Sequence, residues 1–218
     1  MATIAELFGE SLRLRWLRGL EAMLGSAGYE RVAGVDEVGR GSLAGPVVAA
    51  AVIPAPDRVL PGVDDSKKLS SAQRRSLSEA ILRTSIACTV VEVSPQIIDE
   101  INILEATKRA MTGALASLDP EPDCALVDAV ALRGFPFPCL PLVKADALSY
   151  SVACASIVAK VARDCTMEEL HADFPHYDFA TNKGYGAPAH LRALEEFGPS
   201  PVHRLSFRSV LPRRRGEA

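Results

Sequence analysis

The most constraining feature of this chain is an apolar run that leads into two adjacent acids and a glycine-rich turn. Residues 32–41 read Val-Ala-Gly-Val-Asp-Glu-Val-Gly-Arg-Gly. A second run, rich in Val and Ala, follows at 46–53, close enough to predict a β-hairpin. Carboxylates at the end of a buried strand are costly unless their charge is compensated, and glycines let a bulky ligand approach the backbone. The stretch therefore predicts a metal site with a polyanion held against it.

The composition suits one globular domain. Of the 218 residues, 48% are apolar and 23% are charged, which is ordinary for an α/β domain with a full core. No apolar run approaches the roughly 20 residues that span a bilayer, and no secretory signal opens the chain, so we expect a cytoplasmic protein without a membrane partner. The net charge of −3 argues against a protein that coats nucleic acid, but it is compatible with a nuclease. Five cysteines without CxxC spacing are expected to be reduced.

Hydrophobic periodicity predicts a mixed sheet with helices on its faces. Strands are expected at residues 31–36, 46–53, 86–93, 124–127 and 140–144. Helices are expected at residues 4–24, from 70 or 71 onward, and at 95–118, 147–163 and 189–197. Ser70 and Gln73 fit a capping box, and Ser94 with Pro95 fits a helix start. The segment 171–188 is expected to be loop-rich, and the chain from 199 onward irregular. An early hairpin followed by alternating helices and strands indicates an α/β fold.

Four acidic residues follow the ends of predicted strands: Asp36, Glu37, Asp128 and Asp146. The functional crevice of an α/β sheet usually lies at strand ends. Carboxylates that converge there repel one another and raise each other's pKa values, and divalent cations such as Mg²⁺ relieve that repulsion. Two such ions about 4 Å apart could activate a water and stabilise the leaving oxygen of a phosphodiester.

Each acid also has an alternative interpretation that must be weighed. Neighbouring side chains on a strand point to opposite faces, so Asp36 and Glu37 share a site only if the strand kinks or ends there. The glycine turn that follows is expected to supply that break. Taken singly, Asp146 could be the N-cap of the following helix, and Asp128 could be an ordinary turn residue at a strand end. The adjacent pair Asp36 and Glu37 has no such structural need.

Several motifs together resemble the ribonuclease HII family. They lie at residues 34–41 and 43–48, 65–70, 101–107, 127–128, 144–146, 155–164, 182–186, and at His203, Arg204, Ser206 and Phe207. The resemblance covers about residues 30 to 210, and the first motif by itself is highly specific. The resemblance implies a ribonuclease H-like fold with a mixed β-sheet flanked by helices and a C-terminal extension of helices and loops.

The resemblance also implies an activity. The family consists of metal-dependent endoribonucleases (ribonuclease H, type 2) that hydrolyse the RNA strand of RNA–DNA hybrids. They also cut on the 5′ side of a single ribonucleotide in duplex DNA, which starts its removal, and they leave a 3′-hydroxyl and a 5′-phosphate. The reaction uses two divalent ions, Mg²⁺ or Mn²⁺. Carried over onto this sequence, the four catalytic and metal-binding carboxylates are Asp36, Glu37, Asp128 and Asp146.

Recognition of the ribose is expected at the glycine turn and at a tyrosine. The 2′-hydroxyl distinguishes RNA from DNA. The backbone of Gly39, Arg40 and Gly41 could contact that hydroxyl, while the Arg40 side chain could reach a phosphate. Tyr185 lies between two glycines, so its ring is expected to be exposed and to stack on the sugar. Tyr177 lacks that context and is the less favoured candidate.

Phosphate contacts are expected from two further segments. Ser66 and Lys67 precede a helix start, where phosphates bind readily. Ser156, Lys160 and Arg163 lie at helical spacing on one face. This stripe could follow a phosphate backbone, or it could be only the solvated side of the helix.

The domain prediction is one catalytic domain over 1–218. It comprises an N-terminal helix at 1–28, a C-terminal substrate-binding extension at 167–210 and a basic tail at 211–218. We expect a monomer without an obligate protein partner that binds RNA–DNA hybrids and duplex DNA containing ribonucleotides.

Three alternatives remain for the function. Ribonuclease HIII has an added N-terminal domain, for which the roughly thirty residues before the first strand are too few. A non-catalytic ribonuclease H-like module that binds nucleic acid would be expected to lose at least one of the four acids, and none is missing. A phosphate-binding nucleotide enzyme would need the GxxxxGK[ST] pattern, which the sequence lacks.

Overall fold

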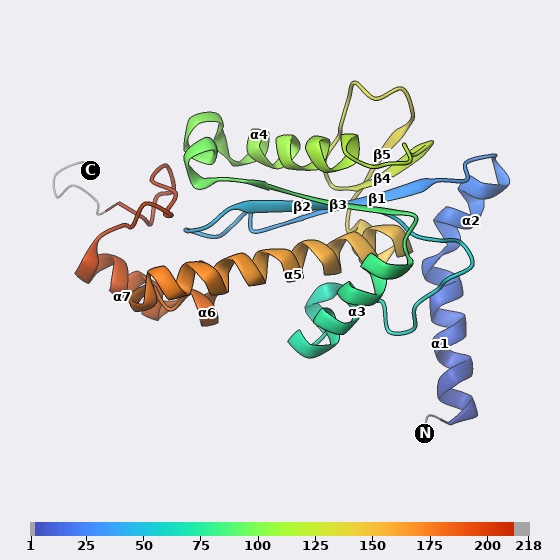
Figure 1. Ribbon diagram of the computed structural model, residues 1–218, viewed down its shortest axis with the longest axis horizontal. Coiled ribbons are helices and arrows are strands. Elements are labelled where there is room, and N and C mark those ends of the chain that lie inside the picture. The colour runs from blue at the N-terminus through green and yellow to red at the C-terminus, as the bar shows by residue number, and fades with distance from the viewer. Residues whose placement is uncertain (1–2, 212–218) are drawn as a thin grey trace.

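The computed structural model describes residues 3–211 and places a five-stranded mixed sheet between helical layers (Figure 1). The strands are β1 (Val32–Val38), β2 (Val47–Ile53), β3 (Ala87–Val93), β4 (Cys124–Asp128) and β5 (Cys139–Leu142), in the spatial order β3-β2-β1-β4-β5. The predicted hairpin is confirmed, because β1 and β2 pair antiparallel. β3 pairs antiparallel with β2, whereas β4 pairs parallel with β1 and β5 pairs parallel with β4.

Helices cover both faces of this sheet, and α3 and α4 begin at the predicted caps Ser70 and Ser94. The α-helices are α1 (Ile4–Leu17), α2 (Gly19–Ser26), α3 (Ser71–Thr84), α4 (Pro95–Ala116), α5 (Tyr150–Asp173), α6 (Phe179–Asn182) and α7 (Pro188–Phe197). The short 3₁₀-helices are η1 (Ser66–Lys68), η2 (Ala145–Ala147) and η3 (Pro175–Tyr177). At α3 the Ser70 hydroxyl accepts from the Gln73 amide while Gln73 accepts from the Ser70 amide, which is the predicted capping box.

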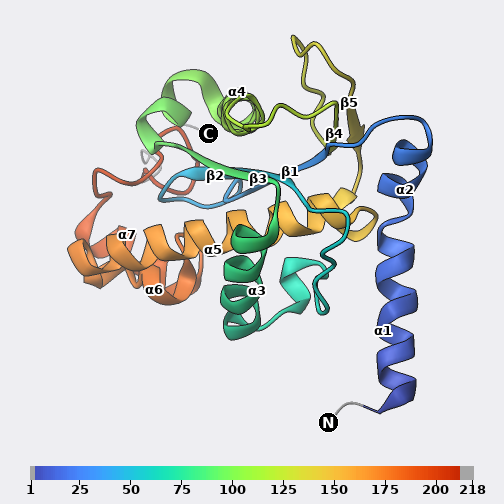
Figure 2. The ribbon, with the colours of Figure 1, turned by 45° about the vertical axis from the view of Figure 1, so that its right-hand side comes forward.

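Two apolar layers hold the sheet between α4 and α5 (Figures 1 and 2). The contact between α5 and β1 is the tighter one and depends on Gly34. A Cβ atom at Gly34 would lie 2.0 Å from the backbone carbon of Ser151, so only glycine lets the helix approach this closely. As a result, α5 runs directly beneath the strand that carries the acidic pair.

Several elements differ from their predicted form. The helix expected at 4–24 breaks at Arg18 into α1 and α2, and α1 projects from the body (Figures 1 and 2). Its apolar residues lie on two faces, so Leu14 and Leu17 are buried while Trp16 stays 73% exposed. Helix α5 begins three residues later than expected and continues to Asp173, ten residues further.

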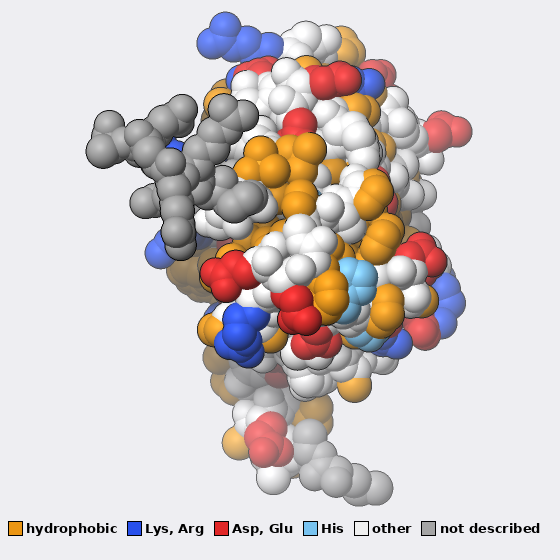
Figure 3. All heavy atoms as spheres, turned by 90° about the vertical axis from the view of Figure 1, so that its left-hand side faces the viewer, with side chains coloured by type: hydrophobic (Ala, Val, Ile, Leu, Met, Phe, Trp, Pro, Cys, Tyr) orange, Lys and Arg blue, Asp and Glu red, His pale blue; other side chains and the backbone are white. Residues whose placement is uncertain are grey.

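The C-terminal part is more ordered than expected. The segment 171–188, predicted to be loop-rich, contains the end of α5 together with η3 and α6. On the face of the molecule at this end, acidic, basic and apolar side chains are interspersed (Figure 3). The basic tail predicted at 211–218 lies, apart from Leu211, outside the described residues. Within residues 3–211 no helix is both long and apolar enough to cross a membrane.

Candidate active site

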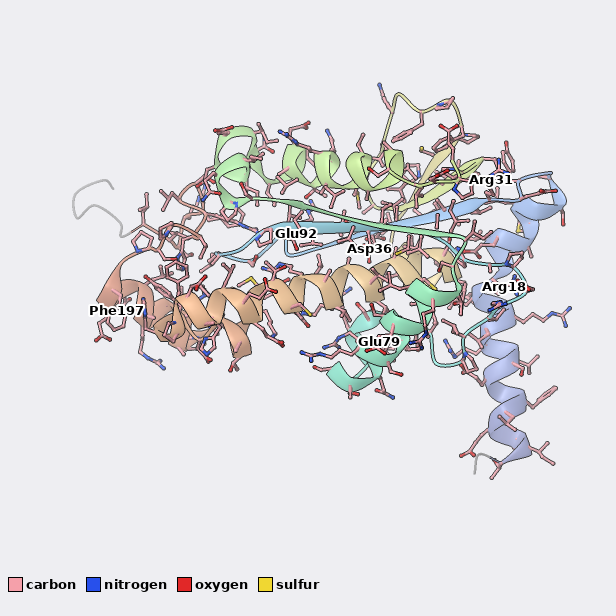
Figure 4. All side chains as sticks on the ribbon, viewed as in Figure 1. Arg18, Arg31, Asp36, Glu79, Glu92 and Phe197 are labelled. Atoms are coloured by element: carbon pink, nitrogen blue, oxygen red, sulfur yellow. The ribbon has the colours of Figure 1, made fainter. Side chains whose placement is uncertain are left out.

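Twelve of the predicted site residues line one cleft, which lies where the parallel strands β1 and β4 end. The twelve are Asp36, Glu37, Gly39, Arg40, Gly41, Ser66, Lys67, Asp128, Asp146, Ser156, Lys160 and Tyr185. Parallel strands present their carboxyl ends at the same edge, which brings the acids of β1 next to the acid of β4. Asp36 lies between the sheet and α5 (Figure 4).

Three carboxylates form the centre of this cleft. Asp36, Glu37 and Asp128 each offer an oxygen, and these oxygens all lie within 4.8 Å of one another. β1 ends at Val38 before the glycine turn, as expected, but it stays paired with β2 at both acids, so no break separates Asp36 from Glu37. The Asp36 side chain instead turns forward along the strand, where its Oδ1 accepts a 2.8 Å hydrogen bond from the Glu37 amide. The direction of the Asp36 side chain thus lets both neighbours contribute to one site while β1 stays paired with β2.

The fourth acid, Asp146, approaches the cluster from η2. Its Oδ2 lies 3.4 Å from Lys67 Nζ, and the cluster of three oxygens does not include it. The Ala145 amide donates to Asp128 Oδ1 at 2.8 Å, which fixes η2 against the end of β4. The alternative that Asp146 caps the next helix is wrong, because Ser149 accepts from the Val152 amide and is the N-cap of α5.

Burial makes the charged forms of these acids unfavourable. Burial, followed by the nearby Glu37 charge, raises the pKa of Asp36 well above its usual value, although the Ser156 hydroxyl opposes this. Burial also raises the pKa of Glu37 and of Asp128, and the repulsion from neighbouring acids adds to both shifts. Among the described residues, Glu37 Oε2 is buried without any hydrogen-bond donor.

The donor set fits a hard divalent cation. Carboxylate oxygens are the ligands that Mg²⁺ and Mn²⁺ prefer. A cation would supply the partner that the buried Glu37 Oε2 lacks and would relieve the repulsion among the three acids. Asp36, Glu37 and Asp128 would hold the cation. Asp146 lies outside this group of three and forms an ion pair with Lys67.

The ribose-recognition candidates line the same cleft as the acids. The ring of Tyr185 is 39% exposed, whereas Tyr177 is buried and donates its hydroxyl to the Gly198 carbonyl. A Cβ atom at Gly41 would meet only Tyr185 Cε1, at 4.0 Å, so a side chain there would extend into the cleft space beside that ring. The arrangement places the glycine turn and the exposed tyrosine next to each other.

The stripe predicted on α5 divides into two parts. Ser156 lies in the cleft with its hydroxyl 3.0 Å from that of Ser66, and Lys160 pairs with Asp164 at its rim. Arg163 does not belong to a surface stripe, because its side chain is completely buried and hydrogen-bonded inside the protein. A helical spacing shows which residues share a face, but which neighbours cover that face depends on the tertiary fold.

Two basic residues of the cleft were not predicted. Arg74 donates to the carbonyls of Ser66 and Leu69, which places its guanidinium over η1. Its position directly after the capping box, one residue beyond Gln73, was the available signal. Lys144 also lines the cleft and adopts a left-handed conformation with φ 57° immediately before η2. Its only signal was its position two residues before Asp146.

A mixed sheet of this order, with clustered carboxylates at the ends of two central parallel strands, defines a metal-dependent nuclease of the ribonuclease H-like fold. The ribonuclease HII family model matches residues 33–210. Ribonuclease HII of Chlamydia muridarum is 54% identical over 184 residues, which are 84% of each chain. The chain therefore belongs to the ribonuclease HII family.

Two further comparisons agree with this assignment. Ribonuclease HII of Ruminiclostridium cellulolyticum is 48% identical over 198 residues, covering 91% of this chain and 78% of the relative. The crystal structure of ribonuclease H2 from Pyrococcus horikoshii matches with a TM-score of 0.74 and 29% identity, covering 83% of this chain and 95% of that one. The protein is thus a metal-dependent endoribonuclease of RNA–DNA hybrids, and the non-catalytic module and the other alternative families are not supported.

Proposed function

We propose that this enzyme also cuts duplex DNA on the 5′ side of a single embedded ribonucleotide, leaving a 3′-hydroxyl and a 5′-phosphate. The observation that carries the proposal is the position of the glycine turn: Gly39, Arg40 and Gly41 line the same cleft as the three clustered carboxylates. One substrate residue can therefore contact both groups, so the ribose is recognised beside the phosphate that is cut.

The carboxylates supply the metal-binding half of the proposed site. Asp36, Glu37, Asp128 and Asp146 would hold two divalent ions, Mg²⁺ or Mn²⁺. When bound, the ions would activate a water and stabilise the leaving oxygen. Lys67 now partly neutralises Asp146 from 3.4 Å, so metal or substrate phosphate would compete with that ion pair.

The ribose-recognition half consists of backbone and aromatic groups. The amides of Arg40 and Gly41 donate to none of the described residues, although both residues line the cleft. A 2′-hydroxyl oxygen can accept from such amides. The exposed face of Tyr185 offers a surface on which a sugar can stack. Ser66, Lys67, Ser156 and Lys160 would contact phosphates along the cleft.

The proposed domain layout follows the same division. The N-terminal segment at 1–28 would be a separate part of the domain, because α1 and α2 supply none of the described residues that line the cleft, whereas the extension at 167–210 supplies Tyr185. We propose that the enzyme acts as a cytoplasmic monomer.

The experiment that tests the assigned acids uses Asp36→Asn on an RNA–DNA hybrid with Mg²⁺ or Mn²⁺. We expect activity to fall by at least about a thousandfold, because removal of one metal ligand disrupts the cation that organises the reaction. Asp173→Asn, at the exposed end of α5, is the matched control and should retain full activity. Retained cleavage in Asp36→Asn would contradict the assignment.

A further inference from the structure

Two arginines are buried inside the protein without a carboxylate partner among the described residues. Arg163 and Arg204 are both 0% exposed, and neither forms an ion pair there. Burying an unpaired guanidinium carries a large desolvation cost, and burial together with the charge of Arg163 lowers the pKa of Arg204 to about 9. This cost requires compensation, which here comes from backbone carbonyls.

Arg163 binds the chain that follows the glycine turn. Its Nε donates to the Pro46 carbonyl at 3.0 Å, and its Nη2 donates to the Ala44 carbonyl at 3.2 Å and to Ser42 Oγ at 2.7 Å. Ser42 Oγ in turn donates to the Gly39 carbonyl at 2.9 Å. The guanidinium is therefore linked through one hydroxyl to the first residue of the turn.

Arg204 binds the same turn from the C-terminal segment. Its Nε and Nη2 both donate to the Gly45 carbonyl, at 3.0 and 2.9 Å, and its Nη1 donates to the Arg40 carbonyl at 3.0 Å. The carbonyls of Gly39 and Arg40 are thus both directed toward the protein interior.

The direction of these carbonyls sets the direction of two amides. In a planar trans peptide the N–H points opposite to the C=O. The amides of Arg40 and Gly41 belong to the two peptide units whose carbonyls are held inward, so they point toward the cleft that both residues line. The arginines thereby orient the amides that we assign to ribose recognition.

Arg163 also reaches the second ribose-recognition group. Its Nη1 donates to the Lys183 carbonyl at 2.9 Å, two residues before Tyr185, and its guanidinium carbon lies 5.5 Å from the centre of the Tyr185 ring. A Cβ atom at Gly39 would meet Arg163 Nε at 2.2 Å, so the turn leaves no space between itself and this side chain. One side chain therefore fixes the turn and the tyrosine relative to each other.

We propose that Arg163 and Arg204 are positioning residues that set the discrimination of ribose from deoxyribose by orienting the amides of the glycine turn and, through Arg163, the ring of Tyr185. This inference rests on the proposed ribose recognition by the turn. Neither arginine touches the substrate, so their effect is on recognition geometry and not on metal binding.

The test measures binding of two labelled duplexes by fluorescence anisotropy without metal, so that no cleavage occurs. One is all-DNA, and the other carries a single ribonucleotide. Lysine keeps the charge but loses the planar fork that bonds several carbonyls at once. We expect Arg163→Lys and Arg204→Lys to reduce the ratio of the two Kd values about tenfold relative to wild type. Arg208→Lys, at an exposed arginine, should leave the ratio unchanged.

If wild type binds both duplexes equally, ribose recognition by the turn is wrong. If wild type discriminates and the lysine variants discriminate equally well, even with a lower Tm, the arginines are only structural and the inference is overturned. If the lysine variants do not fold, the same ratio of Kd values is measured for Ser42→Ala. This variant removes the hydroxyl that links Arg163 to the Gly39 carbonyl and keeps both arginines. An unchanged ratio in Ser42→Ala would then overturn the inference.

Discussion

At the scale of single residues, the metal-free carboxylate cluster should destabilise the protein. Burial raises the pKa of Asp36 and Asp128 in the folded state. For an acid whose folded pKa is raised, stability is greatest below the unfolded pKa and is lost as pH rises through the folded pKa. The metal-free protein should therefore lose stability as pH rises above about 4, and divalent metal should restore it at neutral pH.

Asp128→Asn tests this repulsion directly. An asparagine oxygen can still accept from the Ala145 amide, so the fold of η2 is kept while one charge is removed. We expect the metal-free variant to melt about 3 °C above metal-free wild type at neutral pH, which corresponds to about 1 kcal/mol. Mg²⁺ should raise the melting temperature of the variant less than that of wild type. An equal or lower melting temperature for the metal-free variant would show that the acids do not repel one another.

Residue type and strand position were enough to predict the acidic cluster, because few structural roles place adjacent carboxylates on a buried strand. The same information placed Arg163 on an exposed face of its helix, whereas its side chain is buried. Its burial depends on carbonyls of residues 44, 46 and 183, and neither helical spacing nor local composition reports contacts so distant in sequence. Buried cations that bind carbonyls instead of carboxylates give no charge pattern that a sequence can show.

At the scale of elements, the close contact of α5 with β1 determines where the site is built. Gly34→Ala would force the Cβ atom to within 2.0 Å of the Ser151 backbone, so α5 must move away from β1. We expect destabilisation of about 2 kcal/mol, measured by urea unfolding, together with lower activity as Ser156 moves away from Asp36.

The control is Gly113→Ala in α4, where a Cβ atom meets Val91 at an ordinary 3.4 Å. It should be neutral or stabilising. Equal stability of Gly34→Ala and wild type would contradict this role for the contact.

The capped starts of α3 and α4 were predictable, whereas the end of the short strand β5 was not. Ser70 and Ser94 mark helix starts through local hydrogen bonds that the sequence encodes within four residues. In contrast, β5 ends at Leu142, two residues before its predicted end, because Lys144 turns into a left-handed conformation and η2 begins. A tertiary contact fixes that turn, since the Ala145 amide donates a hydrogen bond to Asp128 Oδ1.

At the scale of the whole molecule, the C-terminal extension brings Tyr185 to acids that come from the sheet. We expect Tyr185→Ala to lower kcat/KM on duplex DNA with one ribonucleotide by about 10- to 100-fold, the usual effect of losing one stacking contact. Tyr185→Phe should retain most of the activity because it keeps the ring. If Tyr185→Phe is as impaired as Tyr185→Ala, the hydroxyl and not stacking is responsible.

Recognition of a single ribose is tested by mapping where the enzyme cuts duplex DNA that contains one ribonucleotide, with Mg²⁺ or Mn²⁺ present. We predict one cut on the 5′ side of the ribonucleotide, with a 3′-hydroxyl and a 5′-phosphate at the new ends, and no cut in the all-DNA duplex. Wild-type enzyme that cleaves long RNA–DNA hybrids but leaves the single ribonucleotide intact would contradict this prediction.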